Sequence, residues 1–307
     1  MCLSYVVHHN RDMSTVPIQP PIAGEPLRLL AVHAHPDDES SKGAASTAKY
    51  VSEGVQVAVV SCTGGERGDV LNPQFDLAGR DIGLVRREEM SNAARVLGIE
   101  HIWLGFEDSG FPDGDPKPPL PPGCFADISL EQAAAPLIDV VRRFRPHVMT
   151  TYDENGGYPH PDHIRTHEVS MYAWEKSGDP SFVTTEQPWT VAKMYYNHTF
   201  TRARVVALHD ALLKAGLDSP YNEWLDGWSE QDDNYERVTT RVPCAEYFEI
   251  RDEALKAHAT QIDPAGSWFA VPHDLQIEIW PTEDFELARS RIGDITNETD
   301  LFEGLRV

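Results

Sequence analysis

Two short segments of this chain carry histidines and carboxylates at spacings that suit a metal site. The first, HAHPDDE at residues 33–39, offers nitrogen and oxygen ligands within a few positions, and the second, DENGGYPHPDH at residues 153–163, offers more. Catalytic metal sites commonly use three protein ligands and leave one position for water. Because neither segment would suffice alone, we expect the two to converge on one divalent cation, with a spare carboxylate left to act as a base.

Both segments begin where a buried strand should end. The apolar periodicity predicts alternating strands (27–34, 55–63, 101–104, 147–152, 193–198) and helices (41–53, 81–97, 129–144, 164–176, 202–215). This alternation predicts an α/β fold with a Rossmann-like open, mostly parallel sheet flanked by helices. The two polar segments would then meet at the carboxyl edge of the sheet.

The organisation along the chain predicts one catalytic domain with additions at both ends. Residues 1–26 are expected to be a disordered tail, and Met13 is an alternative start of the chain. Residues 27–200 would form the Rossmann-like metal-binding core. Residues 201–307 lose the regular alternation and are expected to form a helical or irregular part of the same domain, walling the substrate cleft.

The composition excludes several classes of partner. The chain has 26 Lys and Arg against 49 Asp and Glu, a net charge of −23, which repels nucleic acid and anionic membranes. No apolar run approaches the roughly 20 residues that span a bilayer. Four cysteines without a CxxC pair suit free thiols in a reducing compartment, so we expect a cytoplasmic protein acting on a small molecule.

The segments AHPDDE and HPDH, each after a strand, resemble the metal-dependent N-deacetylases of the PIG-L/LmbE type. Further stretches resemble the mycothiol S-conjugate amidase branch of that family: SSKGAA at 40–45, TGGERGDVLNP at 63–73, TTYDENGGYPHPDHIR at 150–165, KAHATQIDP at 256–264 and WPTEDFELARSRI at 280–292. The resemblance therefore covers nearly the whole chain from about Leu27.

The resemblance and the requirement for three donors agree on His35, Asp38 and His163 as the metal ligands. They would hold one Zn²⁺ per chain, with Fe²⁺ as the alternative, because nitrogen and oxygen ligands suit both ions. Asp37 points away from its neighbour Asp38 and is therefore assigned as the general base.

Two further residues take catalytic roles from the resemblance alone. His160 resembles the family histidine that faces the developing oxyanion, although it could instead orient another residue of the site. Tyr158 resembles a mobile residue that assists it. Asp162 is left with two readings, orienting a histidine ring or capping the helix that begins there.

Substrate contacts also follow from the resemblance. Arg86, Asp108 and Asp69 would line the pocket for a polyol, although Arg86 could instead form a surface pair with Glu88 or Glu89. Lys42, beside the metal loop, most favours the amidase branch over the deacetylases.

The resemblance implies a zinc-dependent amidase that hydrolyses mycothiol S-conjugates, small-molecule thiol conjugates of an aminosugar-inositol, in detoxification. The products would be a mercapturic acid and glucosaminyl-inositol. The nearest alternative is N-acetylglucosaminyl-inositol deacetylase by the same chemistry. A different class is a metal- or sugar-binding protein without turnover.

Overall fold

A computed structural model describes residues 16–228, 233–293 and 297–306. These residues build a seven-stranded sheet with the order β3-β2-β1-β4-β5-β7-β6. The strands are β1 (Arg28–His33), β2 (Gln56–Thr63), β3 (Glu100–Phe106), β4 (Val148–Thr151), β5 (Lys193–Asn197), β6 (Thr240–Pro243) and β7 (Thr282–Ser290). The α-helices are α1 (Asp38–Ser41), α2 (Ala44–Ser52), α3 (Ile82–Leu97), α4 (Leu130–Phe144), α5 (Pro161–Lys176), α6 (Arg202–Lys214), α7 (Asn222–Gly227), α8 (Phe248–Ala257) and α9 (His273–Ile279). Short 3₁₀ helices are η2 (Asn234–Arg237), η3 (Ala245–Tyr247) and η4 (Ser267–Phe269).

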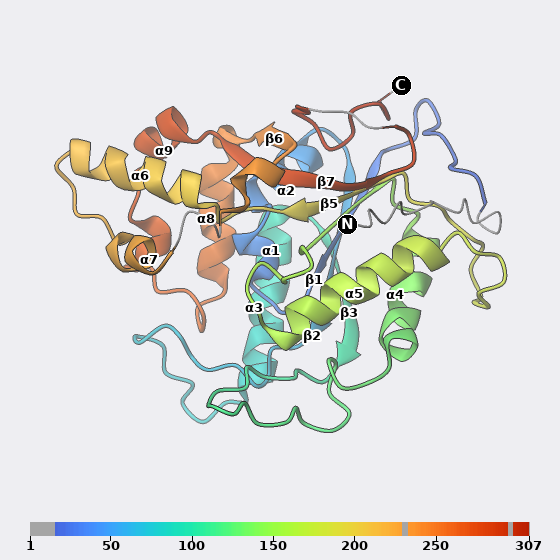
Figure 1. Cartoon of the computed structure of the whole chain (residues 1–307), viewed down its shortest axis with the longest axis horizontal. Helices are drawn as coiled ribbons and strands as arrows, with labels where there is room; N and C mark the ends of the chain where they lie inside the picture. Colours follow the sequence, from blue (N-terminus) through green and yellow to red (C-terminus); the bar gives the residue numbers. More distant parts are fainter. Residues whose placement is uncertain (1–15, 229–232, 294–296, 307) are drawn as a thin grey trace, which may run out of the picture.

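The predicted fold class is confirmed, because β1 to β5 pair in parallel and are connected through helices. The prediction of a helical or irregular part over residues 201–307 is wrong in one respect. That part supplies β7, which pairs antiparallel with β5, and β6, which pairs antiparallel with β7. One sheet therefore continues through both halves of the chain (Figure 1).

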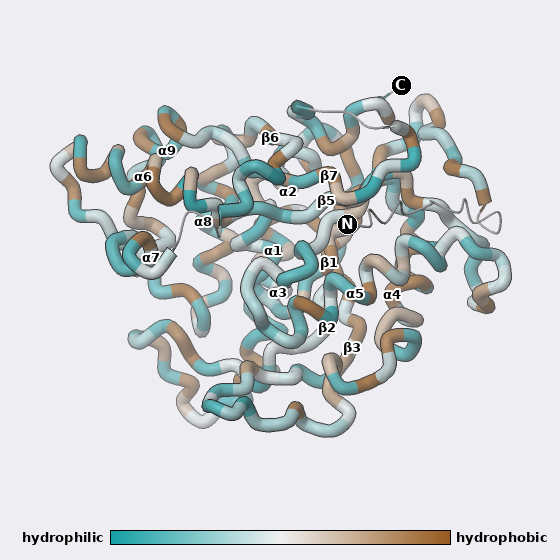
Figure 2. Tube along the Cα trace, viewed as in Figure 1, coloured by the Kyte–Doolittle hydropathy of each residue, from teal (hydrophilic) through white to brown (hydrophobic). Residues whose placement is uncertain are grey.

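Helices cover the two faces of the sheet. Alternate residues of a strand point to opposite faces, so Leu30 and Val32 of β1 pack in the cluster that contains α4 and α5 residues, whereas Leu29 packs with Tyr50 of α2. The hydrophobic stretches of α4, α5 and β3 are visible in Figure 2. At one end of the sheet, α6, α7, α8 and α9 form a helical group (Figure 1).

Local signals explain where the helices begin. Ser129 caps α4 through a capping box with Gln132. The helix expected over 41–53 is interrupted, because Gly43 adopts a left-handed conformation with φ 91° and separates α1 from α2. The helix expected from 164 begins earlier, at Pro161, a residue type suited to a first helical turn.

Part of the expected tail lies against the body of the protein. Residues 1–15, which include Met13, lie outside the described residues. The Val16 amide donates to the Gly178 carbonyl at 2.8 Å, and Ile18 packs against the core. Among the described residues, every helix is too short or too polar to cross a lipid bilayer.

Candidate active site

The site lies where the strand order reverses direction. β1 pairs with β2 on one side and with β4 on the other, so the connections that leave β1 and β4 diverge at this point. Such a reversal opens a crevice outside the carboxyl ends of the strands. The segment 33–39 follows β1 and the segment 153–163 follows β4, which brings the two polar loops side by side.

Three of the predicted residues converge in this crevice. The Asp38 Oδ2 atom lies 3.6 Å from His35 Nδ1 and 3.5 Å from His163 Nε2. Ligands at about 2.1 Å from a tetrahedral ion lie roughly 3.4 Å from one another. All three side chains are buried, and their donor atoms lie within 4.8 Å of one another. The spacing therefore suits one small cation.

The hydrogen bonds leave the correct nitrogens free for such an ion. His163 Nδ1 lies 2.9 Å from the Gly156 carbonyl, which fixes the proton there and leaves Nε2 buried with no hydrogen-bond partner among the described residues. A buried nitrogen without a hydrogen-bond partner lowers the stability of the fold unless something binds it. Here that nitrogen faces two other potential metal ligands. Burial lowers the pKa of His163 to about 3, which keeps the ring neutral, as a metal ligand must be.

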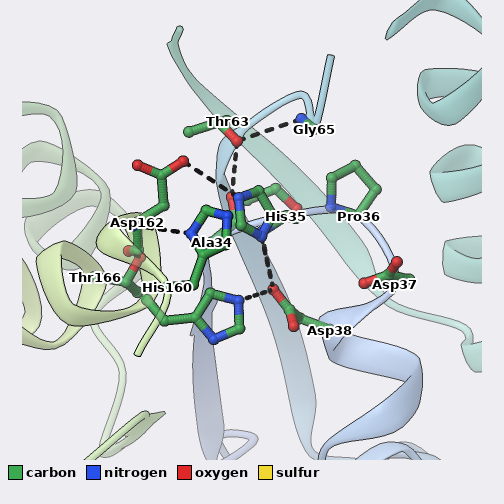
Figure 3. Close-up of polar contacts among 12 residues, drawn as sticks. Ala34, His35, Pro36, Asp37, Asp38, Thr63, Gly65, His160, Asp162 and Thr166 are labelled. Atoms are coloured by element: carbon green, nitrogen blue, oxygen red, sulfur yellow. Dashed lines mark hydrogen bonds and ion pairs between the residues drawn. The ribbon is translucent and has the colours of Figure 1, made fainter. Parts of the chain in front are cut away.

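His35 is oriented from its far side by Asp162. Its Nε2 lies 3.2 Å from Asp162 Oδ2 (Figure 3). This carboxylate also accepts a hydrogen bond from the Ser109 amide at 2.9 Å. Burial disfavours the His35 charge, but hydrogen bonds to Asp108, Asp162 and Asp38 outweigh it and raise the His35 pKa. The negative potential that produces this shift also favours a bound cation.

Of the two readings of Asp162, the structure shows the orienting contact. The cap of α5 is His160, whose Nδ1 accepts from the Asp162 amide at 3.1 Å. A second trio, His35, His160 and Asp162, also has its donor atoms within 4.8 Å. Its His160 Nδ1 and Asp162 Oδ2 already accept hydrogen bonds, so it suits a metal less well than His35, Asp38 and His163.

Asp37 is held apart from Asp38 by the backbone. Its φ of 99° is left-handed and turns its side chain away from that of Asp38 (Figure 3). Burial raises the Asp37 pKa despite the attraction of Arg86, whose guanidinium donates to Asp37 Oδ2 at 3.1 Å. A carboxylate with a raised pKa is a stronger base.

Arg86 is not a surface residue. It is 4 % exposed and donates to the Pro36 and Gly65 carbonyls as well as to Asp37. The alternative pairing with Glu88 or Glu89 is therefore wrong. Glu89 is buried and instead accepts from Thr260. Arg86 contributes to the site chiefly by holding Asp37.

His160 and Tyr158 flank His35, Asp38 and His163, the three candidate metal ligands, which we call the metal trio. The His160 ring centroid lies 4.6 Å from that of His35, and the Tyr158 centroid lies 4.5 Å from that of His163. Burial and the neighbouring His35 lower the pKa of His160 to about 4. Because Nδ1 of this neutral ring accepts from a backbone amide, its proton lies on Nε2, which can donate to an oxyanion.

The predicted substrate residues line two cavities that share Asp37, Asp38 and Tyr158. A cavity of about 280 Å³ is lined by Asp69, Arg86 and Asp108 together with Arg67 and His160. Lys42 lines the other, of about 310 Å³, and its Nζ donates to Asp38 Oδ1 at 2.7 Å. Asp108 is buried and accepts from the amides of Arg67 and Gly110.

One buried pair behind the metal loop carried no role in the sequence analysis. Glu39 Oε1 lies 2.7 Å from His258 Nε2, and Glu39 Oε2 accepts from the Asp37 amide at 2.9 Å. Burial opposes charge on both groups, but their mutual attraction lowers the Glu39 pKa to about 2 and raises that of His258. The stretch KAHAT around His258 was the only signal available for this contact.

The chain is similar in sequence to known proteins over most of its length. A profile of the family described as PIG-L: GlcNAc-PI de-N-acetylase matches residues 30–174. A mycothiol S-conjugate amidase of Streptomyces coelicolor is 57% identical over 91% of this chain and 98% of that protein. The 1D-myo-inositol 2-acetamido-2-deoxy-alpha-D-glucopyranoside deacetylase of Streptomyces scabiei is 37% identical over 95% of this chain and 96% of that protein.

Among solved structures, the N,N'-diacetylchitobiose deacetylase from Pyrococcus horikoshii is similar with a TM-score of 0.58 and 20% sequence identity. The similarity covers 89% of this chain and 88% of that one. At this identity the likeness shows the fold alone.

Proposed function

Because the chain belongs to the PIG-L family, we propose that it is a metal-dependent amidase that hydrolyses mycothiol S-conjugates. The products would be a mercapturic acid and glucosaminyl-inositol, formed during detoxification in the cytoplasm. The observation that carries the proposal is the 57% identity with the Streptomyces coelicolor amidase. The buried free cysteines Cys62, Cys124 and Cys244 support a reducing compartment.

His35, Asp38 and His163 are the proposed ligands, and Zn²⁺ is the proposed ion, with Fe²⁺ as the alternative. When bound, such an ion supplies Lewis-acid polarisation of the amide carbonyl and lowers the pKa of water toward about 7. The neutral His163 and the contact between Asp162 and His35 support this ligand set.

The protein's own residues would then move the protons. Asp37 takes a proton from the attacking water while Arg86 holds its carboxylate in place. His160 donates a hydrogen bond from Nε2 to the oxyanion that forms at the carbonyl oxygen, and Tyr158, which is exposed beside it, assists. When the C–N bond breaks, the proton held by Asp37 passes to the leaving amine, so that the base is regenerated.

The polar cavity would bind the aminosugar-inositol. Asp69 and Asp108 offer carboxylates, and Arg67 and Arg86 offer guanidinium donors, which suit the hydroxyl groups of a polyol. Lys42 lies on the other side of the metal trio, in the 310 Å³ cavity, where it could contact the acyl half of the substrate.

The test compares hydrolysis of an S-conjugate with hydrolysis of N-acetylglucosaminyl-inositol by the purified protein, before and after chelation of metal. We expect preference for the conjugate and loss of both activities on chelation. An Asp37→Asn variant should keep its metal content while turnover falls by roughly 10²- to 10⁴-fold. Preference for the acetyl substrate would overturn the choice of substrate, and bound metal without any hydrolysis would indicate a binding protein.

Deacetylation of N-acetylglucosaminyl-inositol is the second candidate. It is favoured by the 37% identity with the deacetylase of Streptomyces scabiei, which spans nearly the whole chain. The metal trio and Asp37 would perform the same hydrolysis on either amide, so only the relative turnover separates the two candidates.

A further inference from the structure

The cavity that contains Lys42 continues away from the metal trio into a third cavity of about 140 Å³. Both cavities are lined by the same group of residues, Ser41, Thr199, Phe200, Trp224 and Trp268. This shared lining forms the passage between them. The third cavity therefore extends the active site toward α6 and α8, whose residues line it.

The passage is formed by aromatic side chains that remain open to solvent. Phe200 is 39% exposed, Trp224 is 45% exposed and Trp268 is 37% exposed. The Phe200 ring centroid lies 6.0 Å from Trp224 and 5.4 Å from Trp268. Large aromatic residues grouped at an opening are typical of a binding site for an apolar group.

The far wall combines apolar and charged side chains. Val205 and Leu208 of α6 and Val271 line it, together with Arg204, Arg251 and Glu283. Arg204 Nη1 donates to the Thr199 carbonyl at 2.6 Å, whereas its Nε is buried and has no partner among the described residues. A guanidinium held in this way can stack on an aromatic ring.

The size of the cavity defines what it can hold. An apolar protein cavity of about 150 Å³ accommodates benzene. At 140 Å³, this cavity has room for one aromatic ring. The 280 Å³ cavity on the other side of the metal trio is more strongly charged. This difference would orient the substrate, with its polyol in the 280 Å³ cavity and its acyl half toward the 140 Å³ cavity.

We propose that the 140 Å³ cavity binds the S-substituent of the conjugate and selects substituents of the size and polarity of a benzyl group. The proposal rests on the proposed amidase function. A benzyl group on the cysteine sulfur would pass between the aromatic residues and place its ring against Leu208, Val271 and Arg204. A methyl group would leave the cavity unused.

The test compares S-benzyl and S-methyl conjugates of the same aminosugar-inositol thiol with the metal-loaded full chain. Burial of one aromatic ring should raise kcat/KM for the benzyl conjugate by roughly 10- to 100-fold. In Leu208→Phe the larger ring narrows the cavity, and the benzyl-to-methyl ratio should fall. Leu213→Phe is the matched control, because Leu213 lies on the same helix and is 53% exposed, so its ratio should equal that of the wild type.

Two further measurements keep the proposal open to refutation. Trp224→Ala changes an exposed residue and should also lower the benzyl-to-methyl ratio of kcat/KM. It provides the test if Leu208→Phe does not fold. Calorimetric binding of both conjugates to the metal-free protein separates recognition from turnover. Equal binding of the two conjugates, or an unchanged ratio in both variants, would overturn the proposal. Absence of hydrolysis of both conjugates, with retained preference for benzyl in binding, would instead refute the amidase function alone.

Discussion

Gly156 and Gly157 offer a paired test of the metal site. Both have left-handed backbones, with φ of 73° and 72°, so alanine at either position costs about 1 kcal/mol of folding free energy. Only at Gly156 would the new Cβ collide with the site, 2.7 Å from His163 Cβ and 2.9 Å from the Tyr158 carbonyl oxygen. At Gly157 nothing lies within 4 Å of that position.

The collision at Gly156 must displace the backbone next to His163. The Gly156 carbonyl is the group that His163 Nδ1 contacts, so the displacement also disturbs the orientation of the proposed ligand. Loss of such an orienting contact typically weakens metal binding by roughly 10- to 100-fold. We therefore expect Gly156→Ala to lose metal affinity and turnover, and Gly157→Ala to lose only stability.

Denaturant titration of the metal-free variants measures their unfolding free energies. Competition with a chromophoric chelator measures their metal affinity. Gly156→Ala should be the less stable variant, because only its Cβ meets other atoms. A difference of at least about tenfold in metal affinity between the two folded variants would support the reasoning. If Gly156→Ala binds metal as tightly as Gly157→Ala, then His163 is either not a ligand or not oriented by this carbonyl.

Three other predictions concern the surroundings of the site and the core. Asp162→Asn should weaken metal binding by roughly 10- to 100-fold in the same competition assay, whereas Asp139→Asn, an exposed control on α4, should not change it. Lys193→Met should lower the unfolding free energy by about 3 kcal/mol in denaturant titration, because it leaves the buried Glu298 carboxylate without its cation; an unchanged midpoint would contradict this. Burial lowers the pKa of His147 from 6.5 to about 4, so the stability that its neutral ring provides is complete above pH 6.5 and is lost as the pH falls through 4. His147→Asn should therefore reduce the fall in unfolding free energy between pH 6.5 and pH 4, and an identical pH profile would refute the assignment.

The parallel half of the fold could be predicted because its signals are local. Apolar strands and capped helices alternate, and Ser129 and Pro161 lie at helix beginnings. β7 was missed because its charged residues hide the strand pattern. Those charges have distant partners: Glu283 accepts from the Ala45 and Ser46 amides at the start of α2, and Glu286 lies 2.9 Å from His198.

The sequence predicts which loops form the site, but not the residues that orient the candidate ligands and the base. Two polar segments after neighbouring parallel strands must meet, so the convergence of His35, Asp38 and His163 follows from topology. The choice between two readings of Asp162 depends on where the His35 ring lies, and no spacing in the sequence specifies that position.

The contact between Glu39 and His258 shows why such orienting residues cannot be predicted from the sequence. Its two residues are separated by 219 positions, and each has an ordinary alternative role in a helix. Their role becomes clear only from a third group, because Glu39 also accepts a hydrogen bond from the Asp37 amide. A left-handed residue such as Asp37 stays in that conformation only when its surroundings over-determine it. The far end of α8 therefore helps to hold the proposed base, and the carboxyl-terminal part of the chain contributes to the geometry of the site as well as to its walls.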